Sequence, residues 1–260
     1  MKAPTLIVLA SLLIIRTEAQ SVLFDFDSLA AHSGLPGAYT VGGITASMSA
    51  TGQGFSIQPA NSLGFTPAGF AGNCVYPNSI NAADLVVSFS APLTDFSILY
   101  ATQELACDDS ATMRVTAYMN GTLVGMSTTN STALCVCTWQ PNTLGITTTQ
   151  AFNRVVVHYD ARPPTCQDWG PIFLADNMTV TPMPPILLAN MTRLVNGAFQ
   201  FTFTSTPNWP FTVFGTTNPA LPFGNWTTLT GLTETPPGQF QFTDSQATNF
   251  ARRFYRVTSP

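Results

Sequence analysis

The stretch from Phe152 to Pro182 reads FNRVVVHYDARPPTCQDWGPIFLADNMTVTP, and it determines how the rest of the chain is interpreted. Residues 154–159 are rich in β-branched side chains and alternate in polarity, which predicts a strand. Residues 160–170 contain prolines and a glycine and are typical of a loop. Residues 172–181 alternate again, and Pro182 ends this second strand. The stretch therefore predicts a strand, a loop and a closing strand.

The segments upstream repeat the same pattern at short intervals. Apolar residues alternate over 85–89, 96–100 and 113–119, and Asn120-Gly121 is a strong hairpin signal. Strands spaced about 8–12 residues apart with such turns are typical of an antiparallel sandwich rather than of βαβ units. The sequence shows no amphipathic helical pattern of convincing length. We therefore expect an all-β fold.

The chain is expected to divide after residue 181. Three of the four residues in 182–185 are proline, which stiffens a linker between two modules. Beyond it, over 186–260, phenylalanine alternates with polar residues, as in FQFTFT at 199–204, and no cysteine occurs. This pattern predicts a smaller all-β module with an aromatic core, following a β-sandwich domain over 20–181.

The N-terminus predicts export. Lys2 precedes a short apolar run over 6–15, which is too short to span a bilayer comfortably. Thr17-Glu18-Ala19 offers a small residue at the cleavage point, so residues 1–19 are interpreted as a signal peptide and the mature chain begins at Gln20. A retained anchor is the alternative. We expect a secreted or cell-surface protein with no transmembrane segment after cleavage.

Charge excludes several partner classes. The chain has 9 Lys and Arg against 13 Asp and Glu, and charged residues make up 8% of it, against about 25% in an average domain. Loss of Lys2, Arg16 and Glu18 with the signal peptide leaves 7 basic and 12 acidic residues, a net charge of −5 with no lysine. Nucleic acid and anionic membranes require clustered positive charge, so neither is an expected partner.

Five cysteines in an exported chain predict two disulfide bridges and one free thiol. They are Cys74, Cys107, Cys135, Cys137 and Cys166. Counting alternating strands places the loops around Cys74, Cys107 and Cys166 at one end of the sandwich, with Cys135 nearby. The preferred pairing is therefore Cys74 with Cys166, and Cys107 with either Cys135 or Cys137. Zinc is the competing interpretation, which the presence of only two histidines disfavours.

The C-terminal module resembles one that recurs at the C-terminus of exported bacterial proteins. The resemblance rests on NGAFQFTFTSTP, FTVFGTTN, NWTTL, GQFQFTD and the terminal RFYRVTSP. It covers residues 186–260 and implies a bacterial source and a structural or attachment role.

The first domain resembles the galactose-binding-like jelly roll of exported bacterial proteins. The resemblance rests on VLFDFDS at 22–28, MRVTAYMNGTLVG at 113–125, and FNRVVVHYD followed by FLADNMTVTP within 152–182. It implies a jelly-roll-type sandwich. Members of that family often bind carbohydrate without catalysis and often carry a structural calcium, so both are expectations here.

The calcium expectation also has a basis in the residues. The last strand is predicted to carry Ile172, Leu174, Asp176, Met178 and Val180 on one face. A buried ionised carboxylate such as Asp176 needs a cation or several hydrogen-bond donors. Asp25 and Asp27 share a face of the first strand, which can lie near the last strand in a jelly roll, and such oxygen clusters suit calcium. The alternative is a β-bulge that turns Asp176 outward, or hydrogen bonds from backbone N–H groups.

The expected binding surface is at the loop end of the sandwich. Sugars are held where an aromatic ring meets their C–H face and polar groups meet their hydroxyls. Trp169 is in a loop, whereas Trp139 is assigned to the core. The predicted ligand-binding residues are Trp169, Asp168, Asp108, Asp109 and Tyr76. In the alternative, Trp169 covers the core as a lid.

No enzymatic activity is expected. The sequence lacks G-x-S-x-G, H-E-x-x-H and a phosphate-binding loop. The only glutamates of the mature chain are Glu104 and Glu234, although aspartates near the binding loops leave a carbohydrate-active hydrolase as a lesser alternative. The main expectation is an exported carbohydrate- or glycoconjugate-binding protein, and the alternative is a cell-surface structural or adhesive protein without a small ligand.

Overall fold

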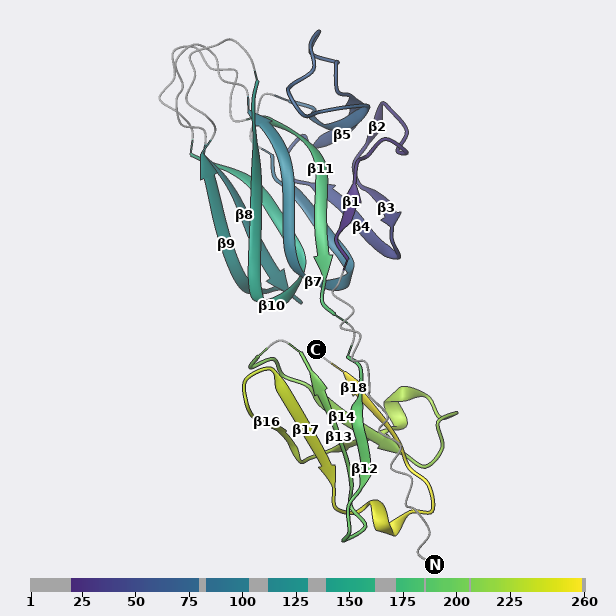
Figure 1. Ribbon diagram of the computed structural model, residues 1–260. Coiled ribbons are helices and arrows are strands. Elements are labelled where there is room, and N and C mark those ends of the chain that lie inside the picture. Colours follow the sequence, from purple (N-terminus) through teal and green to yellow (C-terminus); the bar gives the residue numbers. More distant parts are fainter. Residues whose placement is uncertain are drawn as a thin grey trace, which may run out of the picture.

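The computed structural model describes residues 20–79, 83–102, 112–130, 139–161, 172–184, 186–205 and 207–258. The described residues form eighteen strands and two short 3₁₀ helices, so the predicted all-β fold is confirmed. Strands β1 to β11 form one group and β12 to β18 form another, with no strand pairing between them in the described chain (Figure 1). None of the described helices has the length and hydropathy needed to cross a membrane.

The first group of strands builds the N-terminal sandwich. Its strands are β1 (Val22–Phe24), β2 (Ser33–Gly34), β3 (Gly37–Val41), β4 (Ile44–Ala50), β5 (Phe55–Pro59), β6 (Asn73–Pro77), β7 (Leu85–Thr102), β8 (Thr112–Met119), β9 (Thr122–Asn130), β10 (Gln140–Ala161) and β11 (Phe173–Pro182).

Two long strands, β7 and β10, run through both layers of this sandwich. In one layer, residues 85–90 of β7 pair with β4 and with the second half of β10, which also pairs with β8. In the other layer, residues 95–102 of β7 pair with β11 and with the first half of β10. The pairing between β7 and β10 is interrupted near Phe152. The sequence pattern predicted separate short strands, because Pro92 and the polar residues of 140–151 mask the continuity.

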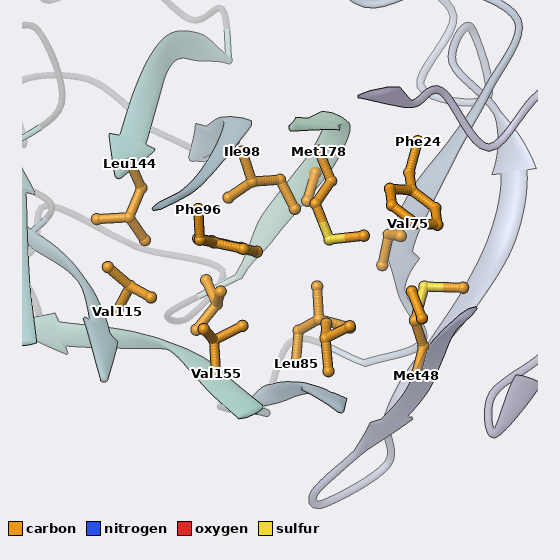
Figure 2. Packing of buried hydrophobic residues seen from close by; sticks show 14 of the residues in the cluster. Phe24, Met48, Val75, Leu85, Phe96, Ile98, Val115, Leu144, Val155 and Met178 are labelled. Atoms are coloured by element: carbon orange, nitrogen blue, oxygen red, sulfur yellow. The ribbon is translucent and has the colours of Figure 1, made fainter. Parts of the chain in front are cut away.

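The core of the sandwich lies between the layers. Because side chains alternate along β7, every second residue of this strand points into the core. Leu85 and Val87 do so from one layer, and Phe96 and Ile98 do so from the other. Figure 2 shows Phe96, Ile98, Leu144 and Met178 facing Leu85, Val115, Val155 and Met48 across this space. Phe24 of β1 and Val75 of β6 extend the same core.

The second group of strands builds the C-terminal module. Its strands are β12 (Ala189–Arg193), β13 (Phe199–Thr204), β14 (Thr212–Thr216), β15 (Thr227–Leu229), β16 (Leu232–Glu234), β17 (Gln239–Asp244) and β18 (Phe254–Thr258). They form a sheet in the order β12-β13-β17-β16 and a smaller one in the order β15-β14-β18. The core between them is aromatic, as predicted, with Phe201, Phe203, Phe240 and Phe242 buried around Val213.

A buried ion pair connects two sequence motifs of this module, GQFQFTD at 238–244 and the terminal RFYRVTSP at 253–260. The phenylalanines of GQFQFTD enter the core, and the motif then ends at Asp244. The Asp244 carboxylate accepts hydrogen bonds from Arg253 at 2.7 Å and from the Tyr255 hydroxyl at 3.0 Å. Burial, followed by the hydrogen bond to Asp244, raises the pKa of Tyr255 to about 12. These residues join the two sheets, so in this motif the charged groups are structural.

The predicted linker is partly held in place. Pro182 is the last residue of β11, one position beyond the predicted boundary, and the Met183 N–H donates to the Pro92 carbonyl. Met183 also packs against a small apolar cluster that contains Met119 and Ala151 of the sandwich and Trp209 of the C-terminal module. The two groups of strands therefore meet at this cluster.

Candidate functional site

The connections that carry the predicted binding residues leave the sandwich at one end. Thr102 at the end of β7 pairs with Gln140 at the start of β10 and with Phe173 at the start of β11. Thr112 at the start of β8 pairs with Asn130 and with Ala161. The Asn142 amide donates to the Asn130 carbonyl, which links these strand ends. The geometry agrees with the expectation that the loops gather at one end.

Most of the predicted binding and disulfide residues lie outside the described residues. This holds for Asp108, Asp109, Asp168, Trp169, Cys107, Cys135, Cys137 and Cys166. Their connections are 103–111 between β7 and β8, 131–139 between β9 and β10, and 162–172 between β10 and β11.

A second apolar cluster lies at the base of these connections. It consists of Ala60, Phe70, Cys74, Ala101, Trp139, Ile172 and Leu174. Three of its members, Ala101, Trp139 and Ile172, lie in or close in sequence to the three connections. Trp139 is 8% exposed, so its assignment to buried packing is confirmed. The cluster gives the loop end a packed floor.

Tyr76 packs against this cluster from β6. It was expected in a long loop, but residues 73–77 form a strand that pairs with β5 and β11. The prediction missed β6 because its NCVYP sequence is short and lies among glycine, asparagine and proline. Tyr76 is half-buried, and burial together with the neighbouring Cys74 raises the pKa of its phenol.

Cys74 is a free thiol, and its side chain is fully buried in the same cluster. The predicted bridge from Cys74 to Cys166 is therefore wrong for this structure. Burial, with a smaller effect of Asp176, raises the pKa of the Cys74 thiol to about 12, so it is a poor nucleophile. A free Cys74 leaves an even number of cysteines for the two predicted bridges, which stay a prediction.

Asp176 does not share a face with Met178 and Val180, so that prediction is wrong. Pairing between β11 and β7 shifts register between Asp176 and Thr179, and Asn177 has a positive φ of 48°. This bulge turns Asp176 to the outer face, with Leu174, while Met178 and Val180 enter the main core. The alternative interpretation, a bulge with backbone donors, describes the observed geometry.

Asp176 is nevertheless buried, with 1% of its surface exposed. Its two carboxylate oxygens accept the backbone N–H of Ala71 at 3.1 Å and that of Asn177 at 2.7 Å. Burial raises the pKa of Asp176 to about 6, the two hydrogen bonds oppose that shift, and the charges of Asp27 and Asp25 add to it. The three predicted carboxylates are thus close enough to influence one another.

Asp25 and Asp27 are brought together by a backbone turn. The strand β1 ends at Phe24, and Phe26 has a positive φ of 61°, which is unusual for a bulky residue. Asp25 Oδ1 accepts the Asp27 N–H at 3.2 Å and the Tyr39 hydroxyl at 3.1 Å. Asp27 Oδ1 accepts the Asn73 N–H at 2.7 Å. Because β1 pairs with β11, the predicted proximity of the first and last strands is confirmed.

The three carboxylates define an acidic cluster around the turn at 69–73. Asp25, Asp27 and Asp176 make no salt bridge with any Arg or His among the residues that the structure describes. Each of them accepts at least one backbone N–H. Within the described ranges, no group of three or more Asp, Glu, His or Cys side chains is close enough to hold a metal ion. The observed arrangement thus satisfies the carboxylates with N–H donors, and calcium stays a proposal.

Gly72 is expected to be essential for this cluster. Its φ is +50°, and a Cβ there would lie 1.8 Å from Asp27 Oδ1. Gly72→Ala should lower the free energy of unfolding by about 2 kcal/mol, because backbone strain adds to the displacement of Asp27 from its Asn73 donor. Urea denaturation followed by circular dichroism measures this.

Gly64→Ala is the matched control for Gly72→Ala. Gly64 also has a positive φ, +84°, but a Cβ there would meet nothing within 4 Å. Its substitution should cost only the backbone strain, about 1 kcal/mol. If Gly72→Ala and Gly64→Ala lowered the free energy of unfolding equally, the contact between a Cβ at position 72 and Asp27 would not contribute to the loss.

A second surface, which the sequence did not predict, lies on the outer face of the sandwich. A shallow, open hollow of about 380 Å³ lies on β11, β7 and β10 beside the N-terminal strand. Small polar side chains form it, including Thr179, Ser97 and Thr147, and Asp95 Oδ1 accepts the Thr147 hydroxyl at 2.6 Å. A sheet face covered by small polar side chains carries no distinctive sequence signal, since it is the ordinary outer side of an alternating strand.

No family model matches the chain, and no curated protein matches it. Among solved structures it is similar to the glycoside hydrolase domain of Endo-D from Streptococcus pneumoniae R6, at 6% identity and a TM-score of 0.32, over 92% of this chain and 41% of that one. The catalytic domain of Agl-KA matches at 10% identity and a TM-score of 0.34, over 63% and 30%. The CBM51-2 and INT domains of Clostridium perfringens ZmpB match at 10% and 0.29, over 56% and 40%. The chain spans less than half the length of each.

Proposed function

We propose that the protein is an exported, non-catalytic binding protein that recognises carbohydrate or glycoconjugate through the loop end of its N-terminal sandwich. One observation carries the proposal. The connections that contain Trp169, Asp168, Asp108 and Asp109 join strands whose ends are paired with one another. The strand ends from which these connections leave therefore belong to one end of the fold, which supports the proposal.

The chemistry of these residues suits a sugar. An indole ring offers a flat surface to the C–H face of a pyranose, and carboxylates accept hydrogen bonds from its hydroxyls. The packed cluster around Cys74 and Trp139 supports the base of the connections, and Tyr76 lies against it. A rigid floor beneath binding loops reduces the entropy that is lost when a ligand orders them.

The remaining parts of the chain complete this proposal. Residues 1–19 are the signal peptide, 20–181 the galactose-binding-like jelly roll, 182–185 the linker and 186–260 a module for structural use or attachment. A structural calcium near Asp25, Asp27 and Asp176 is part of the proposal, supported by the influence of the Asp25 and Asp27 charges on Asp176 and by the absence of a salt bridge to these three carboxylates in the described chain. When bound, calcium would supply positive charge to these groups.

A glycan array of the mature chain, with and without a chelator, tests the function. We expect binding to at least one glycan class. On that glycan, Trp169→Ala should weaken binding by at least about 30-fold, because a central stacking residue commonly contributes 2 kcal/mol or more. Titration calorimetry gives the affinity, and a thermal melt checks that the variant is folded.

Phe65→Ala is the control, because Phe65 is an exposed aromatic residue of the same sandwich that lies outside the predicted site. Its substitution should leave the affinity within about twofold of wild type. Binding that survives Trp169→Ala, or a variant that unfolds, would place the site elsewhere or make Trp169 a lid on the core. An array without any signal, together with binding to whole cells, would favour the adhesive alternative, and release of reducing ends would favour a hydrolase.

A further inference from the structure

The C-terminal module carries a group of three aromatic side chains on the outer face of its smaller sheet and on the adjoining connection, of which Phe223 is exposed and Phe214 and Trp226 are half-buried. Val213 of β14 points into the core, so its neighbour Phe214 points outward. The connection from β14 to β15 contributes Phe223 and Trp226. The Phe214 and Phe223 rings are 4.8 Å apart, and those of Phe223 and Trp226 are 6.0 Å apart, measured between centroids. We call this group the aromatic patch.

An arginine is fixed against the aromatic patch. Arg256 of β18 pairs with Phe214 of β14, and its guanidinium lies 4.4 Å from the centroid of the Phe223 ring. Arg256 is exposed, and it makes no salt bridge or hydrogen bond with any residue that the structure describes. Its orientation is therefore set by the ring, while its N–H groups face solvent.

Charge in the module favours an anionic ligand. Residues 186–260 contain four arginines and only two acidic residues, Glu234 and Asp244. Asp244 is occupied by Arg253, and Glu234 accepts the backbone N–H groups of Asn208 and Gly238. Among the residues that the structure describes, neither Asp244 nor Glu234 is paired with Arg256, although the chain as a whole is acidic.

The shape of the patch favours a sugar over an apolar side chain. Phe223 is 37% exposed, and in the same module Phe254 of β18 and Leu221 of the connection are 38% and 40% exposed. These residues stand on the face of a three-stranded sheet and on the connection next to it, whereas a peptide that pairs with a sheet adds to an edge. Exposed rings on a sheet face suit the C–H face of a pyranose.

We propose that the aromatic patch and Arg256 form a binding site for acidic polysaccharide. The exposed rings contact the apolar faces of successive sugars, and the Arg256 guanidinium binds a sugar carboxylate through two parallel hydrogen bonds. This site is separate from the loop end of the sandwich and does not depend on it.

The test uses the mature chain, residues 20–260, and polygalacturonate as the probe. Affinity electrophoresis and titration calorimetry at fixed salt compare this polymer with its methyl-esterified form, which has the same backbone and no charge. We expect binding to the acid form only. Arg256→Gln should weaken it by at least about 10-fold, and Arg256→Lys should give an intermediate value, because charge is kept and the planar fork is lost.

Arg252→Gln is the matched control, since Arg252 is exposed, nearby in sequence and makes no ring contact. The affinity of Arg252→Gln for polygalacturonate should stay within about twofold of wild type. The same is expected for Trp169→Ala, and this result would separate the site from the proposed loop-end site. Equal losses in Arg252→Gln and Arg256→Gln would mean general attraction of charge and would overturn the proposal. Absence of binding to polygalacturonate, or equal competition by poly-glutamate, would also overturn it.

Discussion

Asp244→Ala is expected to lower the free energy of unfolding of the C-terminal module by about 3–5 kcal/mol, the usual range when one partner of a buried ion pair is removed. Asp244 and Arg253 have side chains that are only 7% and 11% exposed, so water screens the pair weakly. The substitution would leave the Arg253 charge, the Tyr255 hydroxyl and the Gln246 N–H without their acceptor. Urea denaturation followed by circular dichroism measures the loss.

Two controls separate the ion pair from general effects. Asp244→Asn keeps the shape and the acceptor for Tyr255 but removes the charge, and it should be less damaging than alanine. Arg252→Ala removes an exposed arginine next to the pair and should change stability by less than about 0.5 kcal/mol. If Asp244→Ala lowered the free energy of unfolding by less than about 1 kcal/mol, the contacts of Asp244 with Arg253 and Tyr255 would not be what stabilises the two sheets of the module.

Asp176→Asn is expected to remove a pH dependence of stability. The pKa of Asp176 is raised from 3.8 to about 6 in the folded protein. Between these values the folded state holds a proton that the unfolded state has lost, so the free energy of unfolding falls as pH rises through this window and is level above it. A shift of about two pKa units corresponds to about 3 kcal/mol. Asparagine cannot ionise and should lack this decline.

The useful quantity is the difference in stability between wild type and Asp176→Asn at several pH values. The asparagine NH₂ group will face one of the two backbone donors, which costs the variant a constant amount at every pH. The difference in free energy of unfolding between the two proteins should therefore change from pH 4 to pH 7.5, and that change measures the titration of Asp176. Parallel stability curves for the two proteins would contradict the prediction.

The same pair of proteins tests calcium. In the presence of calcium, wild type should be more stable at pH 7.5 than in a chelator, and Asp176→Asn should be insensitive to the chelator. Elemental analysis of undepleted wild type gives an independent measure. A wild type without bound calcium and without response to the chelator would leave the N–H donors of Ala71 and Asn177 as the only stabilising partners of the carboxylate.

Much of the fold could be predicted because burial follows a period of two. Val87 and Phe89, or Phe201 and Phe203, alternate with polar residues, and in the structure each pair lies in a core. The continuity of β10 was not predictable in this way. Residues 140–151 are mostly threonine, asparagine and glutamine, and their strand conformation follows from pairing with β7, which is distant in sequence.

The site was predicted in composition but not in geometry. The charges of Asp25 and Asp27 influence Asp176, but Asp176 reaches its position through a bulge at Asn177, which was only the alternative interpretation of the sequence. The extra residue of a bulge reverses the faces of the strand residues that follow it, and asparagine is only a weak signal for the positive φ found there. The free state of Cys74 was equally hidden, because it depends on packing against Phe70 and Trp139 from other segments.

The antiparallel pairing of β1 with β11 determines how the sandwich would be presented to its surroundings. Val22 lies opposite Val180, and the Ser21 hydroxyl is within hydrogen-bond distance of the Thr181 hydroxyl. The segment that enters the sandwich at Ser21 and the one that leaves it toward Met183 are therefore neighbours, at the opposite end of β11 from Phe173. Both segments leave the sandwich at the same end, so a protein held through its C-terminal module would present the opposite end, where Thr102 pairs with Gln140 and Phe173, to the medium.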